Sequence, residues 1–114
     1  MPAEQEYEVI GPDEYGQFFI RGFKGDKLVA HAEGYPDIDK STLYIKWLGT
    51  LPRYRRKGYG LQLVNKLEEL AEDWDYSAIA LDSKDTRARS FWSAMGYVRI
   101  SGTRFRKILE AGWL

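Results

Sequence analysis

The sequence predicts an α+β protein with a mixed, mostly antiparallel sheet, one parallel pair of strands and two main helices. Two observations lead to this class. Residues before position 50 read as short strands separated by turns, whereas two later segments repeat apolar residues at helical spacing. In addition, a strand–helix–strand unit between residues 42 and 81 requires a parallel pair, because a crossover through a helix joins parallel strands.

The first half of the chain predicts four strands. Residues 7–10 form a short candidate, followed by a turn around Gly11-Pro12-Asp13. Residues 17–23 and 27–32 flank Gly25-Asp26, and glycine at the first central position suits a two-residue hairpin turn of type II′. Residues 42–48 form the next strand after a Gly-Tyr-Pro-Asp loop. Strands joined by short turns of this kind pair in an antiparallel way.

The second half alternates helices and strands. Residues 60–74 place their apolar side chains on one helical face: Leu63, Val64, Leu67, Leu70, Ala71 and Trp74. Residues 76–81 are a nearly continuous apolar run, as in a strand covered on both faces. The next helix repeats its apolar residues at positions 88, 91, 92 and 95, and Gly96 suits the residue just after its end. Residues 97–100 and 104–109 form the last strands.

Length and composition limit the classes of function that this chain can have. The 114 residues are 44% apolar and 15% aromatic, so we expect one domain over residues 1–114 with a core of its own. Lys+Arg and Asp+Glu both number 17, so net charge indicates neither a nucleic-acid nor a membrane partner. Cysteine is absent, which excludes disulfides, thiolate metal sites and a cysteine nucleophile. We expect a soluble, cytoplasmic protein without a metal, a leader or a membrane-spanning segment.

The segment 48–60, which ends a strand and opens a helix, is the most informative. No Ser, Thr, Asp or Asn caps the helix start, and Arg55, Arg56 and Lys57 lie where the helix dipole is already positive. Each such contact costs roughly 0.3–1 kcal/mol when exposed. A bound anion would replace the missing cap, and Gly58 and Gly60 would let the backbone approach a phosphate closely. The alternative is a basic, solvated turn whose glycines only allow the corner.

Two motifs resemble a known family. The pattern Arg55-x-x-Gly58-x-Gly60, preceded by Pro52, resembles the acetyl-coenzyme A pyrophosphate loop of the GNAT superfamily of N-acetyltransferases, [Gln/Arg]-x-x-Gly-x-[Gly/Ala]. The later segment 85–97 is similar to that family's helix motif, Asn-x-x-Ala-x-x-[Leu/Phe]-Tyr-x-x-x-Gly-Phe. Both motifs occur in the family's order within residues 42–100, about half of the chain.

The resemblance implies a site for acetyl-CoA. The strand before the loop would splay from the next parallel strand, so that the pantetheine arm enters between them and bonds the backbone of Leu48 and Thr50. The second helix would line the other side through Asp85 and Phe91. The pyrophosphate would be held by Arg55, Arg56, Lys57, Gly58, Tyr59 and Gly60. The implied reaction is direct attack of a primary amine, on a protein or a small molecule, on the thioester in a ternary complex. The absence of cysteine agrees with direct attack, because no acyl-cysteine intermediate can form.

Three departures from the family pattern bear on activity. Trp92 stands where relatives have a tyrosine acid, and an indole N–H cannot supply a proton. Asp85 replaces an asparagine and has an alternative role as the helix N-cap. Only six residues, 11–16, separate the first two strands, so the family's two acceptor-side helices cannot exist here. We therefore expect an open acceptor side that favours a bulky acceptor such as a protein amine.

Two further residues are candidates for acid–base chemistry. His31 is the only histidine and lies on a strand, where a structural role is the alternative. Asp82 ends the strand parallel to the cofactor strand, where capping or loop formation is the alternative. With Trp92 they form the candidate catalytic set.

Two other functions compete with the transferase. A coenzyme A-binding or regulatory protein of the same fold, with little catalysis, is consistent with Trp92 and the missing helices. A nucleic-acid-binding module would use residues 53–57 on phosphates, but the zero net charge counts against it. The sequence leaves the acceptor and the oligomeric state, monomer or homodimer, open.

Overall fold

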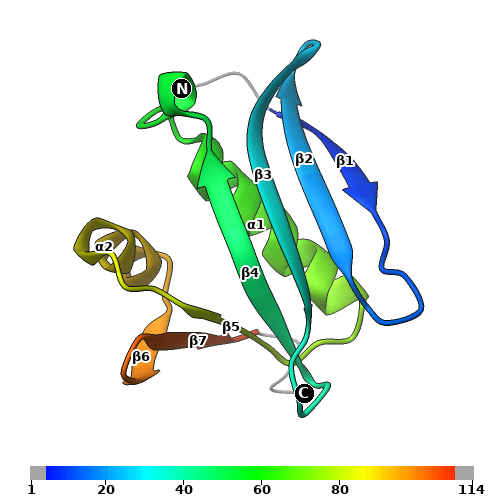
Figure 1. The fold of residues 1–114 in the computed structure, drawn as a ribbon, viewed down its shortest axis with the longest axis vertical. Coiled ribbons are helices and arrows are strands. Elements are labelled where there is room, and N and C mark those ends of the chain that lie inside the picture. Colours follow the sequence, from blue (N-terminus) through cyan, green and yellow to red (C-terminus); the bar gives the residue numbers. More distant parts are fainter. Residues whose placement is uncertain (1–4, 110–114) are drawn as a thin grey trace.

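The computed structural model describes residues 5–109, which form a seven-stranded sheet in the order β1-β2-β3-β4-β5-β7-β6 (Figure 1). The strands are β1 (Glu6–Ile10), β2 (Phe18–Lys24), β3 (Lys27–Pro36), β4 (Thr42–Thr50), β5 (Ala78–Asp82), β6 (Val98–Ser101) and β7 (Arg104–Ile108). β4 and β5 pair in parallel, and the remaining pairs are antiparallel. The α+β class with one parallel pair is therefore confirmed.

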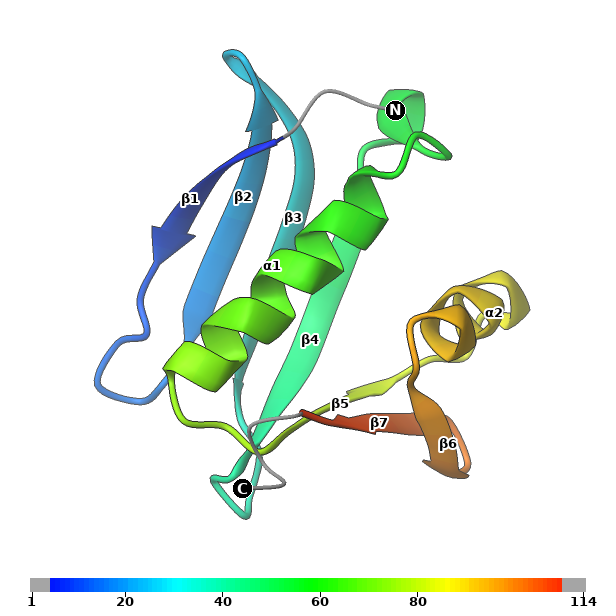
Figure 2. The same cartoon turned by 180° about the vertical axis from the view of Figure 1, so that it is seen from behind.

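Two helices pack against this sheet. α1 (Tyr59–Asp73) covers one face of the β1–β4 half, and α2 (Thr86–Ala94) lies beside the β5–β7–β6 half (Figure 2). A short 3₁₀ turn, η1 (Pro52–Tyr54), links β4 to α1. None of the helices described within residues 5–109 is both long and apolar enough to span a membrane.

The core lies between α1 and the strands. Helix residues Leu63, Val64, Leu67 and Ala71 are fully buried, as the helical periodicity predicts, whereas Leu70 and Trp74 are only partly buried at its edge. The strand residues packed in the same core include Phe18, Ile20, Val29, Leu43 and Ile79. Every residue of β5 except Asp82 is buried, which agrees with a strand covered on both faces.

The β2–β3 hairpin confirms one predicted turn and corrects one predicted boundary. Lys24 pairs with Lys27, and Gly25 has φ 65°, the left-handed value that the turn needs at its first central position. β3 continues to Pro36, so its predicted end at residue 32 was wrong. Gly34 lies within the strand, opposite Phe18 and Ile45. A Cβ there would overlap the Tyr44 carbonyl oxygen, so this close approach requires glycine.

The sheet face opposite α1 has no helix over it in the described part of the chain (Figure 1). β1 ends at Ile10 and β2 begins at Phe18, and the connection contains only turns, so the expected absence of helices before the second strand is confirmed within residues 5–109. The Asp13 carboxylate ties this connection by accepting the backbone N–H groups of Tyr15 and Gln17 at 2.9 Å. We call the sheet face opposite α1 the open face. From the strand register it includes Glu8, Ile10, Phe19, Arg21, His31, Glu33, Tyr35, Tyr44 and Trp47.

Candidate active site

β4 and β5 separate halfway along β4. Their last paired residues are Ile45 and Leu81, yet β4 remains paired with β3 as far as Thr50. Between the separated strands lies a cavity of about 410 Å³, which we call the cleft. It is lined by residues 45–48 of β4, residues 81–85, and Ala88 and Trp92 of α2. Backbone groups on this edge of β4 have lost their partner strand and are available to a ligand.

A β-bulge lies at the same place. Gly34 is opposite Ile45, but Glu33 is opposite Trp47, so Lys46 is an extra residue on β4. A bulge of this kind reverses the alternation of side chains beyond it. Leu48 therefore lies on the α1 side, opposite buried Ala32, while Trp47 lies on the open face. Strict alternation along the sequence cannot reveal this.

The turn into α1 has the features expected of an anion site. Arg56 and Gly58 have φ values of 62° and 87°, and such left-handed residues can turn successive backbone N–H groups toward one point. Gly58 is the N-cap of α1 and provides no side-chain acceptor, and the first helical turn contains no acid. The predicted uncapped helix start is confirmed.

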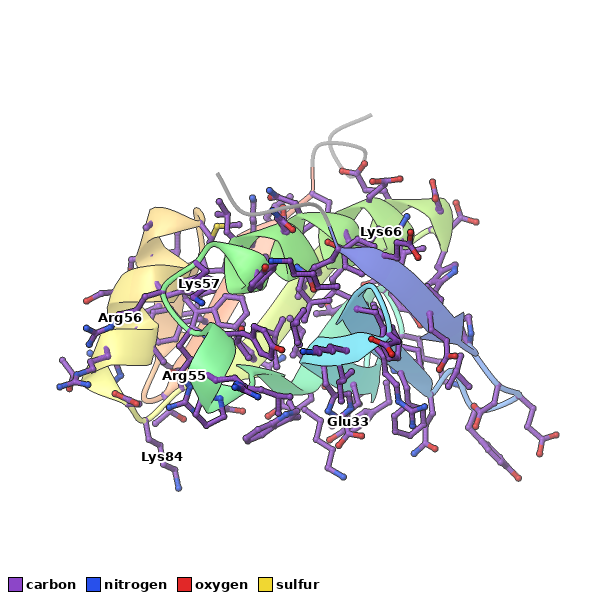
Figure 3. The ribbon with its side chains drawn as sticks, turned by 90° about the horizontal axis from the view of Figure 1, so that it is seen from above. Glu33, Arg55, Arg56, Lys57, Lys66 and Lys84 are labelled. Atoms are coloured by element: carbon purple, nitrogen blue, oxygen red, sulfur yellow. The ribbon has the colours of Figure 1, made fainter. Side chains whose placement is uncertain are left out.

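Three cations surround this helix start. Arg55, Arg56 and Lys57 lie around the turn that leads into α1 (Figure 3). The Arg55 Nε donates to the Thr50 carbonyl oxygen at 3.3 Å, and the Lys57 Nζ lies 6.0 Å from the centre of the Tyr54 ring. Within residues 5–109, none of the three forms an ion pair with an acid. Their charge is therefore available to an anionic ligand.

Gly60 lies where β4, α1 and α2 meet. A Cβ at this position would be 3.5 Å from the Thr50 Oγ1 and 3.9 Å from the Phe91 ring. The neighbouring Tyr59 side chain is buried in the core, so only the backbone of Tyr59 is available to a ligand. Phe91 is half-buried, and its ring centre is 5.1 Å from that of Trp92.

Asp85 caps α2. Its carboxylate accepts the backbone N–H of Arg87 at 2.9 Å, so the N-cap role left open by the sequence is present in the structure. Asp85 also lines the cleft, and its contact with the cofactor stays a prediction.

Trp92 lies in the wall of the cleft and is only 6% exposed. Its ring packs edge-on against Tyr97 with the centres 4.9 Å apart. Tyr97 is a core residue, and its hydroxyl donates to the Glu68 carboxylate at 2.9 Å. Burial and the nearby Glu68 carboxylate raise the pKa of Tyr97, so this phenol is a poor proton donor.

Asp82 lines the cleft but is already engaged. It accepts hydrogen bonds from the Tyr44 hydroxyl at 2.7 Å and the Thr103 hydroxyl at 2.9 Å. These bonds hold the pKa of the Asp82 carboxyl below its usual range, which makes it a weak proton acceptor. Burial and the Asp82 carboxylate raise the pKa of Tyr44 to about 12. An ion pair between Arg104 and Asp37 adjoins this network.

We expect Tyr44→Phe to lower the free energy of unfolding by about 0.5–1 kcal/mol at pH 7, because an exposed charged acceptor loses one donor. The folded pKa of Asp82 is lowered, so its stabilising contribution is present above the unfolded value of about 3.9 and is lost as pH falls through the folded value. The difference from wild type should therefore shrink as pH falls below about 4 in urea titrations. Tyr35→Phe is the control, since the Tyr35 hydroxyl makes no bond to Asp82. An unchanged difference at low pH would contradict this account.

His31 lies outside the cleft. It lines a second cavity of about 420 Å³ at the start of β3 and the end of β4, bordered also by Trp47, Leu48, Thr50 and Arg55. Its Nε2 is 3.9 Å from the Glu33 carboxylate. Thus Leu48, Asp82, Asp85 and Trp92 share the cleft, while His31 belongs to the neighbouring cavity.

Sequence reasoning missed Glu33. Its two-residue spacing from His31 and Tyr35 places all three on one face of a strand, and that signal was available. The cross-strand neighbour that makes it informative, Trp47, depends on the bulge. Within residues 5–109, no group of three potential metal ligands comes together.

The splayed parallel pair and the anion-ready helix start define an α+β protein with a cleft that opens beside a site suited to an anion. Residues 2–97 match the model of the acetyltransferase (GNAT) family. The chain therefore belongs to the GNAT acetyltransferase family. A comparison with curated proteins gives no match.

Solved structures share the fold at low sequence identity. A GNAT-family acetyltransferase from Staphylococcus aureus Mu50 has a TM-score of 0.75 at 17% identity, over 84% of this chain and 70% of the other. The ribosomal-protein-S18-alanine N-acetyltransferase of Escherichia coli gives 0.73 at 14%, over 85% and 71%. The PaiA N-acetyltransferase of Thermoplasma acidophilum, in complex with coenzyme A, gives 0.69 at 18%, over 82% and 61%. At these identities the likeness shows the fold alone.

Proposed function

We propose that this protein is an acetyl-CoA-dependent N-acetyltransferase that transfers an acetyl group to a primary amine. The observation that supports it is the junction of the cleft with the uncapped, cation-flanked start of α1. The cleft suits a slender arm that bonds to strand backbone, and the helix start suits a pyrophosphate. Coenzyme A combines these two parts, and the PaiA structure of the same fold contains it.

The residues present fit this cosubstrate. The backbone of Leu48 and Thr50, beyond the last residue that pairs with β5, would bond the pantetheine amides. Asp85 and Phe91 of the α2 segment would line the opposite wall. The pyrophosphate would be held by backbone N–H groups and cations of Arg55, Arg56, Lys57, Gly58, Tyr59 and Gly60.

When bound, acetyl-CoA supplies a thioester carbonyl carbon. The amine nitrogen of the acceptor forms the new C–N bond there while the C–S bond breaks, and the sulfur keeps the electron pair and takes up a proton in place of the one that the amine loses. Backbone N–H groups of the separated part of β4 would donate to the carbonyl oxygen as it gains charge. Asp82 and Trp92 in the cleft, and His31 in the neighbouring cavity, remain our candidates for residues near the chemistry.

The acceptor side is open. No helix covers the open face in the part of the chain that the structure describes, which supports an acceptor as bulky as a protein lysine or N-terminus. A cytoplasmic location and a single domain over residues 1–114 stay predictions, and the oligomeric state stays open.

Calorimetry with coenzyme A tests the binding step. We expect binding that weakens as salt rises, because unpaired cations meet a polyanion. Arg56→Gln should weaken binding by roughly 3-fold to 10-fold, the effect of one charge-assisted contact near the surface. Arg99→Gln, in the remote β6–β7 hairpin, is the matched control. Acetylation of an amine panel by the wild type then tests transfer, and an absence of coenzyme A binding would rule the function out.

A second function is favoured by one observation. Trp92 occupies the cleft where the family's proton donor would stand, and its indole is only a hydrogen-bond donor. A coenzyme A-binding or regulatory protein with little catalysis would show intact binding in calorimetry but no turnover of any amine or lysate protein.

A further inference from the structure

Glu33 lies in the middle of the open face, beside the bulge of β4. Its cross-strand neighbours are Phe19 on β2 and Trp47 on β4. Directly opposite residues on one sheet face have Cβ atoms about 4.5–5.5 Å apart. His31 and Tyr35 lie two residues away on its own strand and share the face. The register therefore places one carboxylate within a frame of aromatic neighbours. Glu33 lies on the side of the sheet away from α1 (Figure 3).

The Glu33 carboxylate has no hydrogen-bonded partner among the described residues, and its two ion pairs are loose. The Glu33 side chain is only 24% exposed, yet the nearest basic nitrogens, His31 Nε2 and Lys46 Nζ, are both 3.9 Å from its carboxylate, beyond hydrogen-bond distance. Lys46 is 65% exposed, and such a loose pair contributes little stability. By contrast, Glu8 on the same face has an arginine partner at 3.2 Å. The Glu33 carboxylate is thus available to a cation from outside the chain.

Trp47 links Glu33 to the cleft. Its side chain is exposed, and it lines both the cavity that contains His31 and the cleft. Neighbouring strands lie about 4.8 Å apart, and the cleft is on the far side of β4 from Glu33. A cation at Glu33 is therefore separated from the cleft by the width of β4. It is a different group from the amine that attacks in the cleft.

We propose that Glu33 binds a second ammonium group of the acceptor, so that the substrate class is a primary amine with a second positive charge. This inference rests on the proposed transferase function. The alkyl chain of the acceptor would cross the Trp47 ring, and the aromatic frame would favour the cation through its ring faces. An alkyl diamine and a peptide with neighbouring lysines both present this chemistry.

Kinetics with matched acceptors test the proposal. We expect Glu33→Gln to raise the KM for 1,4-diaminobutane by roughly 10-fold to 100-fold, because one charge-assisted hydrogen bond to the substrate is lost. The value of kcat should change little. The KM for butylamine, which lacks the second charge, should not change. Glu8→Gln removes one charge from the same face and should leave both values unchanged, whereas Glu33→Asp should restore part of the diamine preference. The KM values of a peptide with two adjacent lysines and of a peptide with one lysine should also be compared. A Glu33-dependent preference for the two-lysine peptide would indicate a peptide acceptor rather than a small diamine.

Calorimetry of 1,4-diaminobutane binding, with and without coenzyme A, gives a readout that needs no turnover. Wild type should bind the diamine more tightly than butylamine, and Glu33→Gln should remove the difference while its melting temperature stays near that of wild type. Equal binding of the two amines, or no effect of Glu33→Gln, would overturn the Glu33 site even if coenzyme A binds. Failure of coenzyme A to bind, together with Glu33-dependent diamine binding, would instead reject the transferase function and retain the site.

Discussion

Gly60→Val is expected to weaken coenzyme A binding by about 100-fold, which corresponds to close to 3 kcal/mol of binding free energy. The physical reason is the position of the missing side chain. A Cβ on Gly60 already contacts Thr50 and Phe91, so the two methyl groups of valine would fill the space between the end of β4 and α2. That space is where the backbone of the helix start would approach the pyrophosphate.

The control separates this effect from damage to the helix. Leu61→Val introduces the same β-branched residue one position later, where the side chain is exposed. Gly60→Ala is a second comparison, because its Cβ meets its neighbours at ordinary contact distance and alanine favours a helix over glycine. Gly58 is a poorer position for this test, since its φ of 87° would strain any replacement. Calorimetry measures the affinity and urea unfolding the stability. Tight binding by a folded Gly60→Val protein would reject the loop as the pyrophosphate site.

Trp92→Tyr is expected to raise the acetylation rate by about 100-fold, the low end of the range for general acid catalysis, because a thiolate already leaves well. The substitution places a phenol in the wall of the cleft, where the indole now has no acidic proton. Affinity for coenzyme A should change little. A stability loss of roughly 1–3 kcal/mol is expected, since the Trp92 ring packs between Phe91 and Tyr97.

Trp92→Phe isolates the contribution of the hydroxyl group. It loses the same packing as the tyrosine variant but has no proton to donate, so its rate should stay near that of wild type. The rates of all three proteins should be measured as a function of pH, because only the tyrosine variant should show a new loss of activity at alkaline pH. Equal rates for the tyrosine and phenylalanine variants would show that no acid is needed at this position. A fast wild type that either substitution slows would identify another group as the acid.

Much of the fold was predictable from local patterns. The order of strands and helices, the single parallel pair and the short β1–β2 connection follow from side-chain periodicity and from turn residues such as Gly25. The anion-ready turn was predictable too, because Arg55 to Gly60 is a contiguous segment whose missing cap is visible in the sequence. Features of this kind depend on residues that are neighbours in the chain.

The parts that were not predictable depend on contacts across the sheet. Asp82 is held by Tyr44 and Thr103, which are 38 and 21 residues away in the chain, so its engagement and lowered pKa follow only from the strand register. The position of His31 outside the cleft likewise depends on which face of β3 it occupies. The proximity of Glu33 to Trp47 also follows only from the bulged register of β3 and β4.

The bulge at Lys46 decides which face of the sheet each later residue of β4 occupies. If β4 continued here as a regular strand with the same residues, Lys46 would lie opposite Glu33, Trp47 would turn toward the helix side and Leu48 toward the open face. A bulky indole would then enter the packed layer against α1, and the separated edge of β4 would offer the opposite set of side chains to its surroundings. The irregular pairing of β4 with β3 therefore constrains the protein as strictly as the identity of any one side chain of the strand.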